Sequence, residues 1–300
     1  MEKFVVRSIV RRTAQTFLLS LVAFAATEAQ AVDTQPFDFV PAPAGTNLAL
    51  VYYTYGHSSE YISASGNKVN GSSLQSNIMI ARYVHYFDFF GMTADINFLQ
   101  PFGAFNDVKI GGKPLTHSDF DVGNTTLIFT IWPINDAERQ IYFGIANYLI
   151  VANGSYDVRK SINLGDNRWS FVIQPAFHAK LYDKVSIDLV GDVSFYGDNN
   201  DASPTGGQLS QEPSFSVQAW LNYNFTPTIA ASIGMSHLYN GEQKLDGVSL
   251  SDGHVTKIKA ALSTFVTPTT QVLLQIDHDV SVENSFSQEF GATLRLMTVF

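Results

Sequence analysis

The chain has 300 residues, of which 45% are hydrophobic, 13% are aromatic and only 15% are charged. Its formal net charge is −9 and it lacks basic clusters, which argues against nucleic acid as a partner. It contains no cysteine, so disulfide bonds and thiol chemistry are excluded. Hydrophobic residues are abundant, yet no run of them after residue 31 is long enough for a membrane-spanning helix, and this combination is typical of alternating β-strands.

Residues 1–31 are predicted to be a secretory signal peptide that is removed from the mature protein. A basic beginning precedes an apolar stretch over residues 16–26, and Ala29-Gln30-Ala31 is a small-residue cleavage site. A transmembrane anchor is the alternative, but this stretch falls well short of the roughly 20 residues that span a bilayer as a helix. Cleavage would leave 14 basic and 25 acidic residues, a net charge of −11.

Residues 32–45 contain three prolines and are predicted to form a stiff, extended segment rather than a domain. Two alternatives stay open for this segment. It is either a periplasmic tail or a small plug inside the barrel that follows it.

Residues 46–300 are predicted to form an all-β fold, a transmembrane antiparallel up-and-down β-barrel of about twelve strands in the cell outer membrane. Segments of about ten residues alternate hydrophobic and polar side chains, and short and long connections follow one another in turn. A soluble β-sandwich is the alternative, but it does not require this asymmetry of connections. The predicted strands are 46–58, 73–86, 90–100, 121–132, 140–151, 169–181, 186–196, 213–225, 229–239, 254–265, 270–280 and 287–300.

The inner face of the barrel is predicted from charged residues that share one side of a strand. In the segment 186–196, Asp188 and Asp192 lie on one face and hydrophobic residues on the other. Two aspartates facing lipid would cost too much free energy, so both are predicted to face the lumen. The final strand places Arg295 opposite its hydrophobic face, and hence inward.

Hairpin geometry then predicts pairs of opposite charge directly across neighbouring strands, which stabilise each other. The pairs follow from a three-residue turn near residue 184 and from the pairing of residues 266 and 270. Whether they brace the barrel or line a selective pore stays open. The predicted pairs are Lys180–Asp188, Lys257–Asp279 and Lys259–Asp277.

The last strand ends on Phe300, as the closing strands of outer-membrane barrels characteristically do. We expect the lipid bilayer to be one partner of the chain. The barrel-assembly machinery, which would recognise Phe300, is expected to be another.

The connection 152–169 is the most distinctive segment, and it contains no catalytic set. Its glycines supply turns, and its Asn and Asp side chains can cap backbone groups. It is predicted to be a rigid corner at the start of a strand, with a solute gate at the mouth as the alternative. The candidate residues are Asn163, Asp166, Asn167, Arg168 and Trp169.

Residues capable of catalysis or metal binding do not form a recognisable site. His278 lies between Asp277 and Asp279 on a strand, so its side chain points away from both carboxylates. Ser236 and His237 are adjacent and therefore face opposite sides of the wall, which argues against a lipid hydrolase. We expect no enzyme activity, no metal and no cofactor.

The chain resembles a known family in several segments that occur in order. They include DFDVGNTTLIFTIWP (119–133), NGSYDVRKSINLGDNRWSF (153–171), SFYGDNND (194–201) and YNGEQKLDGVSLSD (239–252). The resemblance is to the putative MetA-pathway of phenol degradation family, and it covers about residues 40–300. It implies an outer-membrane channel that admits small hydrophobic or aromatic compounds such as phenols.

Together these features predict passive diffusion of a small-molecule solute through the barrel. A barrel of about twelve strands can enclose a narrow passage, whereas eight-stranded barrels are filled by side chains. A structural barrel with a filled lumen and a membrane-embedded lipid hydrolase are the alternatives.

Overall fold

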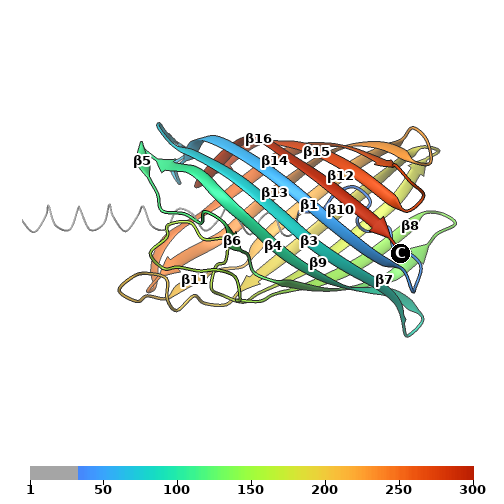
Figure 1. The fold of residues 1–300 in the computed structure, drawn as a ribbon, viewed down its shortest axis with the longest axis horizontal. Helices are drawn as coiled ribbons and strands as arrows, with labels where there is room; N and C mark the ends of the chain where they lie inside the picture. Colours follow the sequence, from blue (N-terminus) through green and yellow to red (C-terminus); the bar gives the residue numbers. More distant parts are fainter. Residues whose placement is uncertain (1–32) are drawn as a thin grey trace, which may run out of the picture.

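The computed structural model describes residues 33–300, and the predicted signal peptide lies outside them. Within this part of the chain, twelve long antiparallel strands form one closed β-barrel (Figure 1). The predicted fold class is therefore confirmed. The strands are β1 (Asn47–Ile62), β3 (Ser73–Phe89), β4 (Met92–Ile110), β7 (Thr126–Asp136), β8 (Ile141–Ile150), β9 (Ser170–Tyr182), β10 (Val185–Tyr196), β12 (Ser214–Asn224), β13 (Ile229–Leu245), β14 (Val248–Phe265), β15 (Thr270–Glu283) and β16 (Ser285–Val299).

The barrel closes where its first and last strands meet. Leu48 of β1 lies opposite Val299 of β16, and the pairing continues along both strands. Beyond it, the backbone N–H of Asn47 donates to the carbonyl of Phe300 at 3.1 Å, and the N–H of Phe300 donates to the carbonyl of Asn47 at 3.0 Å. The wall of twelve long strands therefore has no free edge that could pair with another chain.

The two ends of the barrel differ in their connections. The turn end, where Phe300 lies, carries short connections such as Phe90-Gly91, whose positive φ angles of 52° and 83° suit a two-residue hairpin turn. The loop end carries the longer connections, including 111–125, 151–169 and 197–213. Three of its four short strands, β2 (Lys68–Val69), β5 (Lys113–Pro114) and β11 (Leu209–Gln211), extend the neighbouring hairpins, and the fourth, β6 (Asp121–Val122), pairs with β4.

Several predicted boundaries at the loop end are wrong. The predicted loop 240–253 is largely strand, because β13 and β14 continue to Leu245 and Val248. Asp246-Gly247 joins them with φ angles of 49° and 78°, values that Asp and Gly adopt readily. The predicted strand 121–132 begins only at Thr126, because residues 121–122 form the separate strand β6.

Side chains alternate between a lipid-facing outer surface and the lumen. Outward-facing Ile233 and Leu274 are 64% and 50% exposed, whereas inward-facing Gln174 and Asn222 are fully buried. A continuous exposed hydrophobic wall around a polar interior is the reverse of a water-soluble fold, and it suits a hydrocarbon environment. At the turn end, outward aromatic rings form a belt, for example Phe89 against Phe90 with centroids 4.8 Å apart.

No helix among residues 33–300 is long and apolar enough to cross a membrane.

Candidate functional site

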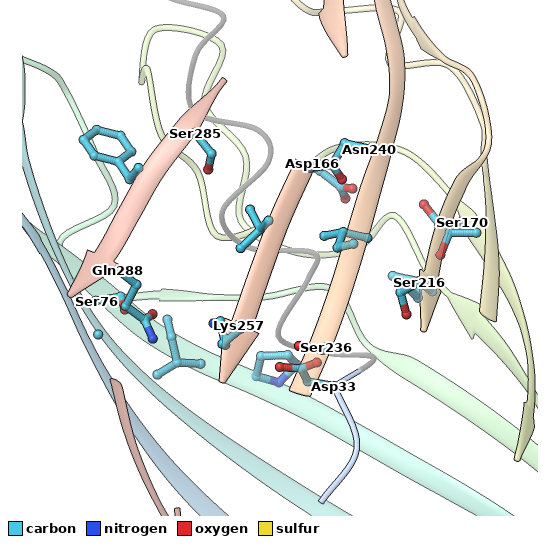
Figure 2. A pocket seen from close by; sticks show the side chains of 18 of the residues that line it. Asp33, Ser76, Asp166, Ser170, Ser216, Ser236, Asn240, Lys257, Ser285 and Gln288 are labelled. Carbon is cyan, nitrogen blue, oxygen red and sulfur yellow. The ribbon is translucent and has the colours of Figure 1, made fainter. Parts of the chain in front are cut away.

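The segment that precedes β1 lies inside the barrel. We call residues 33–45 the inner plug. From the turn end, where the N–H of Gly45 donates to the carbonyl of Tyr86 at 2.8 Å, it reaches Asp33 beside the middle of the lumen. Asp33 is seen in Figure 2 near Lys257 and Ser236. Of the two alternatives for residues 32–45, these contacts favour the plug.

Apolar packing holds the inner plug against the wall. Phe39 is only 6% exposed and belongs to a buried cluster that includes Ile128 of β7, Tyr148 of β8 and Val172 of β9. The indole N–H of Trp132 donates to the carbonyl of Phe39 at 3.0 Å. These side chains fill much of the lumen toward the turn end.

Three of the charges predicted to face inward bind the inner plug. Lys259 Nζ lies 2.9 Å from Asp33 Oδ1, and Arg295 donates from Nη1 to Asp38 Oδ1 at 2.9 Å. The backbone N–H of Phe37 donates to Asp188 Oδ2 at 3.3 Å. Alternation placed Asp188, Lys259 and Arg295 correctly on the inner face, but their partners on the plug were not predicted.

The hairpin of β14 and β15 has the predicted register. Lys257 lies opposite Asp279, and Lys259 opposite Asp277. The ion pairs themselves differ from the prediction, because Lys257 Nζ lies 3.4 Å from Asp277 and 3.8 Å from Asp279, whereas Lys259 is drawn to Asp33. The ammonium group of Lys257 therefore lies within ion-pair distance of both Asp277 and Asp279.

The predicted pair of Lys180 with Asp188 is wrong. Asp188 lies opposite His178, whose Nδ1 is 2.5 Å from Asp188 Oδ1, and Lys180 lies opposite Ser186. The turn has only two residues, and Leu181 of β9 is an unpaired bulge residue next to it, so the register shifts by two residues from the one predicted. Lys180 ends up exposed near the turn end.

Asp192 is the predicted inward residue with the fewest charged neighbours. It is 9% exposed and accepts hydrogen bonds from Ser216 Oγ and, at 3.4 Å, from Gln174 Nε2. Both bonds end on Oδ2. Among residues 33–300, no Lys, Arg or His forms an ion pair with Asp192, whereas Asp188 is paired with His178, and Asp277 and Asp279 are paired with Lys257.

At the loop end, residues 152–169 fold into the mouth of the barrel, and we call them the outer cap. Arg168, at 2% exposure, lies 3.4 Å from Asp166, donates to Gln211 Oε1 at 2.7 Å, and stacks over the ring of Tyr196 at 4.4 Å. Asp166 also accepts a hydrogen bond from Asn124. The guanidinium therefore joins the cap to β10 and β11.

The other predicted cap residues fix its backbone. Asn163 Oδ1 accepts from the N–H of Asp157 at 2.9 Å. Asn167, with a positive φ of 55°, donates to Asn199 Oδ1 at 2.9 Å. Trp169 is 53% exposed on the outer surface, just before β9.

Sequence reasoning missed the apolar residues of the cap. Ile162 and Leu164 are 1% and 9% exposed and pack inside the mouth with Leu74, Phe105 and Phe286 of the wall. The alternation of polar and apolar residues in INL was the available signal, but a loop has no fixed period from which a direction could be predicted.

Between the outer cap and the inner plug lies a cavity of about 170 Å³, the central cavity. Figure 2 shows Ser170, Ser216 and Ser236 of the wall and Asp166 of the cap among the side chains that line it. Its polar arc, from β10 to β15, comprises Asp192, Ser194, Ser216, Gln218, Ser236, Lys257 and Asp279, with Leu238 and Val255 as apolar residues among them. Its apolar arc, from β3 to β9 with the cap, comprises Leu74, Ile78, Ile80, Phe105, Ile150, Leu164 and Val172, with Ser76, Thr126 and Ser170 as polar residues among them.

The residues weighed for catalysis lie apart. Ser236 is buried and faces the central cavity, whereas His237 is exposed on the outer surface with Nδ1 2.8 Å from Thr256 Oγ1. The prediction that they face opposite sides of the wall is confirmed. Among the described residues, no group of three or more His, Asp or Glu side chains is placed to hold a metal ion.

Comparison with known proteins identifies the type of barrel. The sequence family described as Putative MetA-pathway of phenol degradation matches residues 58–296. A crystal structure of an outer membrane channel from Pseudomonas putida F1 is 28% identical, with a TM-score of 0.82, over 89% of this chain and 100% of that chain. A deletion mutant of the TodX monoaromatic hydrocarbon channel shares the fold at 7% identity and a TM-score of 0.50, over 89% of this chain and 92% of that chain.

A sequence search of curated proteins gives no significant match. The barrel and its resemblance to outer-membrane channels place the chain in the cell outer membrane, with its exposed hydrophobic wall in the lipid bilayer.

Proposed function

The chain belongs to the family described as Putative MetA-pathway of phenol degradation, and from this premise we propose that it is a passive outer-membrane channel for small hydrophobic and aromatic compounds. The central cavity carries this proposal. Its volume of about 170 Å³ is close to that of an engineered apolar cavity of about 150 Å³ that binds benzene. A single aromatic ring therefore fits.

The chemistry of the lining supports an amphipathic solute. The ring of a phenol can pack against the apolar arc, for instance Ile78 and Val172, while its hydroxyl faces the polar arc at Ser216 or Ser236. A sugar, which carries hydroxyls on every side, would leave some of them without partners against the apolar arc. The similarity to the outer membrane channel from Pseudomonas putida F1 supports the channel function.

Transport requires movement at both ends of the central cavity. The outer cap covers it with Leu164, and the inner plug closes the turn end with Phe39. Both are connecting or terminal segments, which move more readily than the paired strands of the wall. We propose that solutes cross one at a time, as cap and plug give way in turn.

A structural barrel with a filled lumen is the second candidate, and the packing of the inner plug around Phe39 favours it. The two functions differ in whether solute ever passes. In cells without their own general porins, the channel predicts faster initial uptake of labelled phenol at low concentration, and no faster uptake of a hexose. Phenol uptake equal to that of cells without the protein would favour the second candidate, a structural barrel with a filled lumen.

A matched pair of variants makes this test specific. Ser236→Phe places a ring in the central cavity, whereas Ile233→Phe, on the same strand, adds a ring to the lipid-facing side. Uptake of phenol should fall strongly in the first variant and stay unchanged in the second. Equal uptake in both would show that solute does not pass through the cavity.

We also propose that the barrel-assembly machinery recognises the chain through Phe300, whose side chain is 66% exposed at the turn end. Ser236 and His237 lie on opposite sides of the barrel wall, so these two residues cannot act together as a hydrolytic pair.

A further inference from the structure

The central cavity has unequal charges around it. Its lining and the side chains paired with it contain five carboxylates, those of Asp33, Asp166, Asp192, Asp277 and Asp279. Three cations oppose them, those of Arg168, Lys257 and Lys259. The region therefore carries a formal net charge of −2. Cleavage before Val32 would add one ammonium group next to Asp33, and carboxylates would still be in excess.

Part of this excess negative charge lies on Asp192, a residue of the polar arc. Asp192 Oδ2 accepts both hydrogen bonds that this carboxylate receives, from Ser216 and Gln174. A carboxylate has about four acceptor positions, so Asp192 retains acceptor capacity on the side that lines the cavity. No Lys or Arg among the described residues neutralises it.

Two further polar atoms at the cavity lack hydrogen-bond partners within the described chain. Oδ1 of Asp279, a residue only 7% exposed, accepts no hydrogen bond, and its nearest cation is Lys257 Nζ at 3.8 Å. Oγ of Ser170, a residue 3% exposed, is likewise without a partner. Buried polar atoms are normally satisfied, so their presence beside a cavity points to a polar ligand or water there.

From these observations we infer that the central cavity is a binding site for single-ring compounds bearing a hydrogen-bond donor, and that it favours cationic amines over neutral alcohols and rejects carboxylates. An arylmethylammonium group would donate to Asp192 while its ring packs against the apolar arc. A benzoate of similar size would place a second anion beside uncompensated carboxylates, in a confined space where charges are poorly screened. This inference rests on the proposed function and specifies the solute class.

The test measures binding, so that its result does not depend on transport. Purified full-length mature protein in detergent at neutral pH is dialysed to equilibrium against labelled benzylamine, benzyl alcohol and benzoate. The expected affinities fall in that order, with benzylammonium bound at least about tenfold more tightly than benzoate, as expected for one charge-assisted hydrogen bond.

Asp192→Asn keeps the shape of the side chain and removes its charge. It should weaken benzylammonium binding about tenfold, change benzyl alcohol binding much less and strengthen benzoate binding. The matched control is Asp183→Asn, an exposed aspartate in the turn between β9 and β10. Heat-dependent gel mobility confirms that each variant is a folded barrel.

Equal binding of benzylammonium and benzoate, absence of binding by all three, or an unchanged affinity of Asp192→Asn for benzylammonium would overturn the inference. Failure of the proposed function is a separate result. It would appear as the expected binding order without any uptake of phenol by cells.

Discussion

Lys259 Nζ lies 2.9 Å from Asp33 Oδ1, so a lysine in the middle of the barrel wall holds the first described residue of the chain. The lysine is 4% exposed, and Gln218 Oε1 accepts a second hydrogen bond from it at 3.3 Å. Together with the bond of Arg295 to Asp38, this contact fixes both ends of the acidic part of the inner plug. The plug is thus attached by these two ion pairs, by the hydrogen bond from the N–H of Phe37 to Asp188, and by the packing of Phe39 against the inner face of the wall.

Removing the ring of Phe39 should release the inner plug. Burial of this side chain against Ile128 and Val172 is the main apolar contact of the segment, and a buried Phe→Ala change typically costs about 3–5 kcal/mol. The barrel wall keeps its own hydrogen bonds, so the loss should fall on the docking of the plug. We expect Phe39→Ala to raise single-channel conductance in a planar bilayer.

Phe120→Ala is the matched control, because Phe120 is 69% exposed in a loop-end connection. It should leave the conductance as it is in the unmodified protein. If Phe39→Ala and Phe120→Ala conduct equally, the plug does not restrict the passage.

Arg168→Ala should lower the heat resistance of the barrel more than it alters transport. The guanidinium is almost completely buried between Asp166, Gln211 and the ring of Tyr196. Breaking a buried ion pair from one side typically costs about 3–5 kcal/mol, because the remaining charge loses its partner. The temperature at which the folded gel band disappears measures this loss, and uptake of phenol measures transport.

The control for this change is Arg159→Ala, which removes an arginine of the same outer cap whose side chain is 80% exposed. Its effect on heat resistance should be negligible. A fall in the transport rate of Arg168→Ala at unchanged heat resistance would mean that the cap acts as a solute gate and not as a rigid corner.

The outer cap should become less stable in acid, because protonation of Asp121 breaks its ion pair with Lys160. Lys160 Nζ lies 2.9 Å from Asp121 Oδ2, and this hydrogen bond holds the pKa of Asp121 below its usual value of 3.8. A carboxyl group whose pKa is lower in the folded state stabilises that state above its unfolded pKa. The stabilisation is lost as the pH falls through the folded pKa.

Both side chains are partly exposed, so the contribution is about 1 kcal/mol or less. We expect cleavage by an acid-active protease within residues 152–161 to increase between about pH 5 and about pH 3. In Asp121→Asn the cap should be equally sensitive at both pH values. A pH step that persists in Asp121→Asn would assign the loosening to another group.

The wall of the barrel was predictable because two requirements act on every strand at once. A side chain must suit lipid or lumen, and its neighbours two residues away must suit the same medium, so a strand such as 186–196 has only one acceptable orientation. The same requirement fixed the register of Lys257 with Asp279, since both carry charge. Lys180 was paired wrongly because the bulge at Leu181 changes the register, and its side chain lies near the exposed turn end, where either medium is tolerated.

The contents of the lumen were not predictable in the same way. The inner plug and the outer cap have no fixed period, so neither the direction of Phe39 nor that of Ile162 follows from its neighbours. Their positions depend on the space that the finished barrel leaves. The free carboxylate of Asp192 could be assigned to the lumen from alternation, but its lack of a cationic partner depends on contacts between distant strands.

Phe300 offers a test of how the chain reaches the membrane. Its ring is 66% exposed and lies 6.5 Å from the ring of Tyr83, while its backbone completes the pairing with Asn47. Phe225, at the same end of the barrel, is 52% exposed and packs on Tyr223 with centroids 5.0 Å apart. The two rings thus have similar surroundings, and Phe300→Ala leaves the backbone pairing in place.

If both rings contribute only by burial in the interfacial layer, Phe300→Ala and Phe225→Ala should reduce the yield of folded barrel to a similar, small extent. If the assembly machinery reads the terminal aromatic residue, only Phe300→Ala should lower the yield in the outer membrane severalfold, while the purified variant refolds in detergent as well as the parent protein. We expect the second result. Recognition of Phe300 by the assembly machinery would act before the barrel has formed, whereas a contact of its ring with the interfacial layer can act only afterwards. Equal yields from the two variants would show that Phe300 contributes only by burial in the interfacial layer and is not recognised by the assembly machinery.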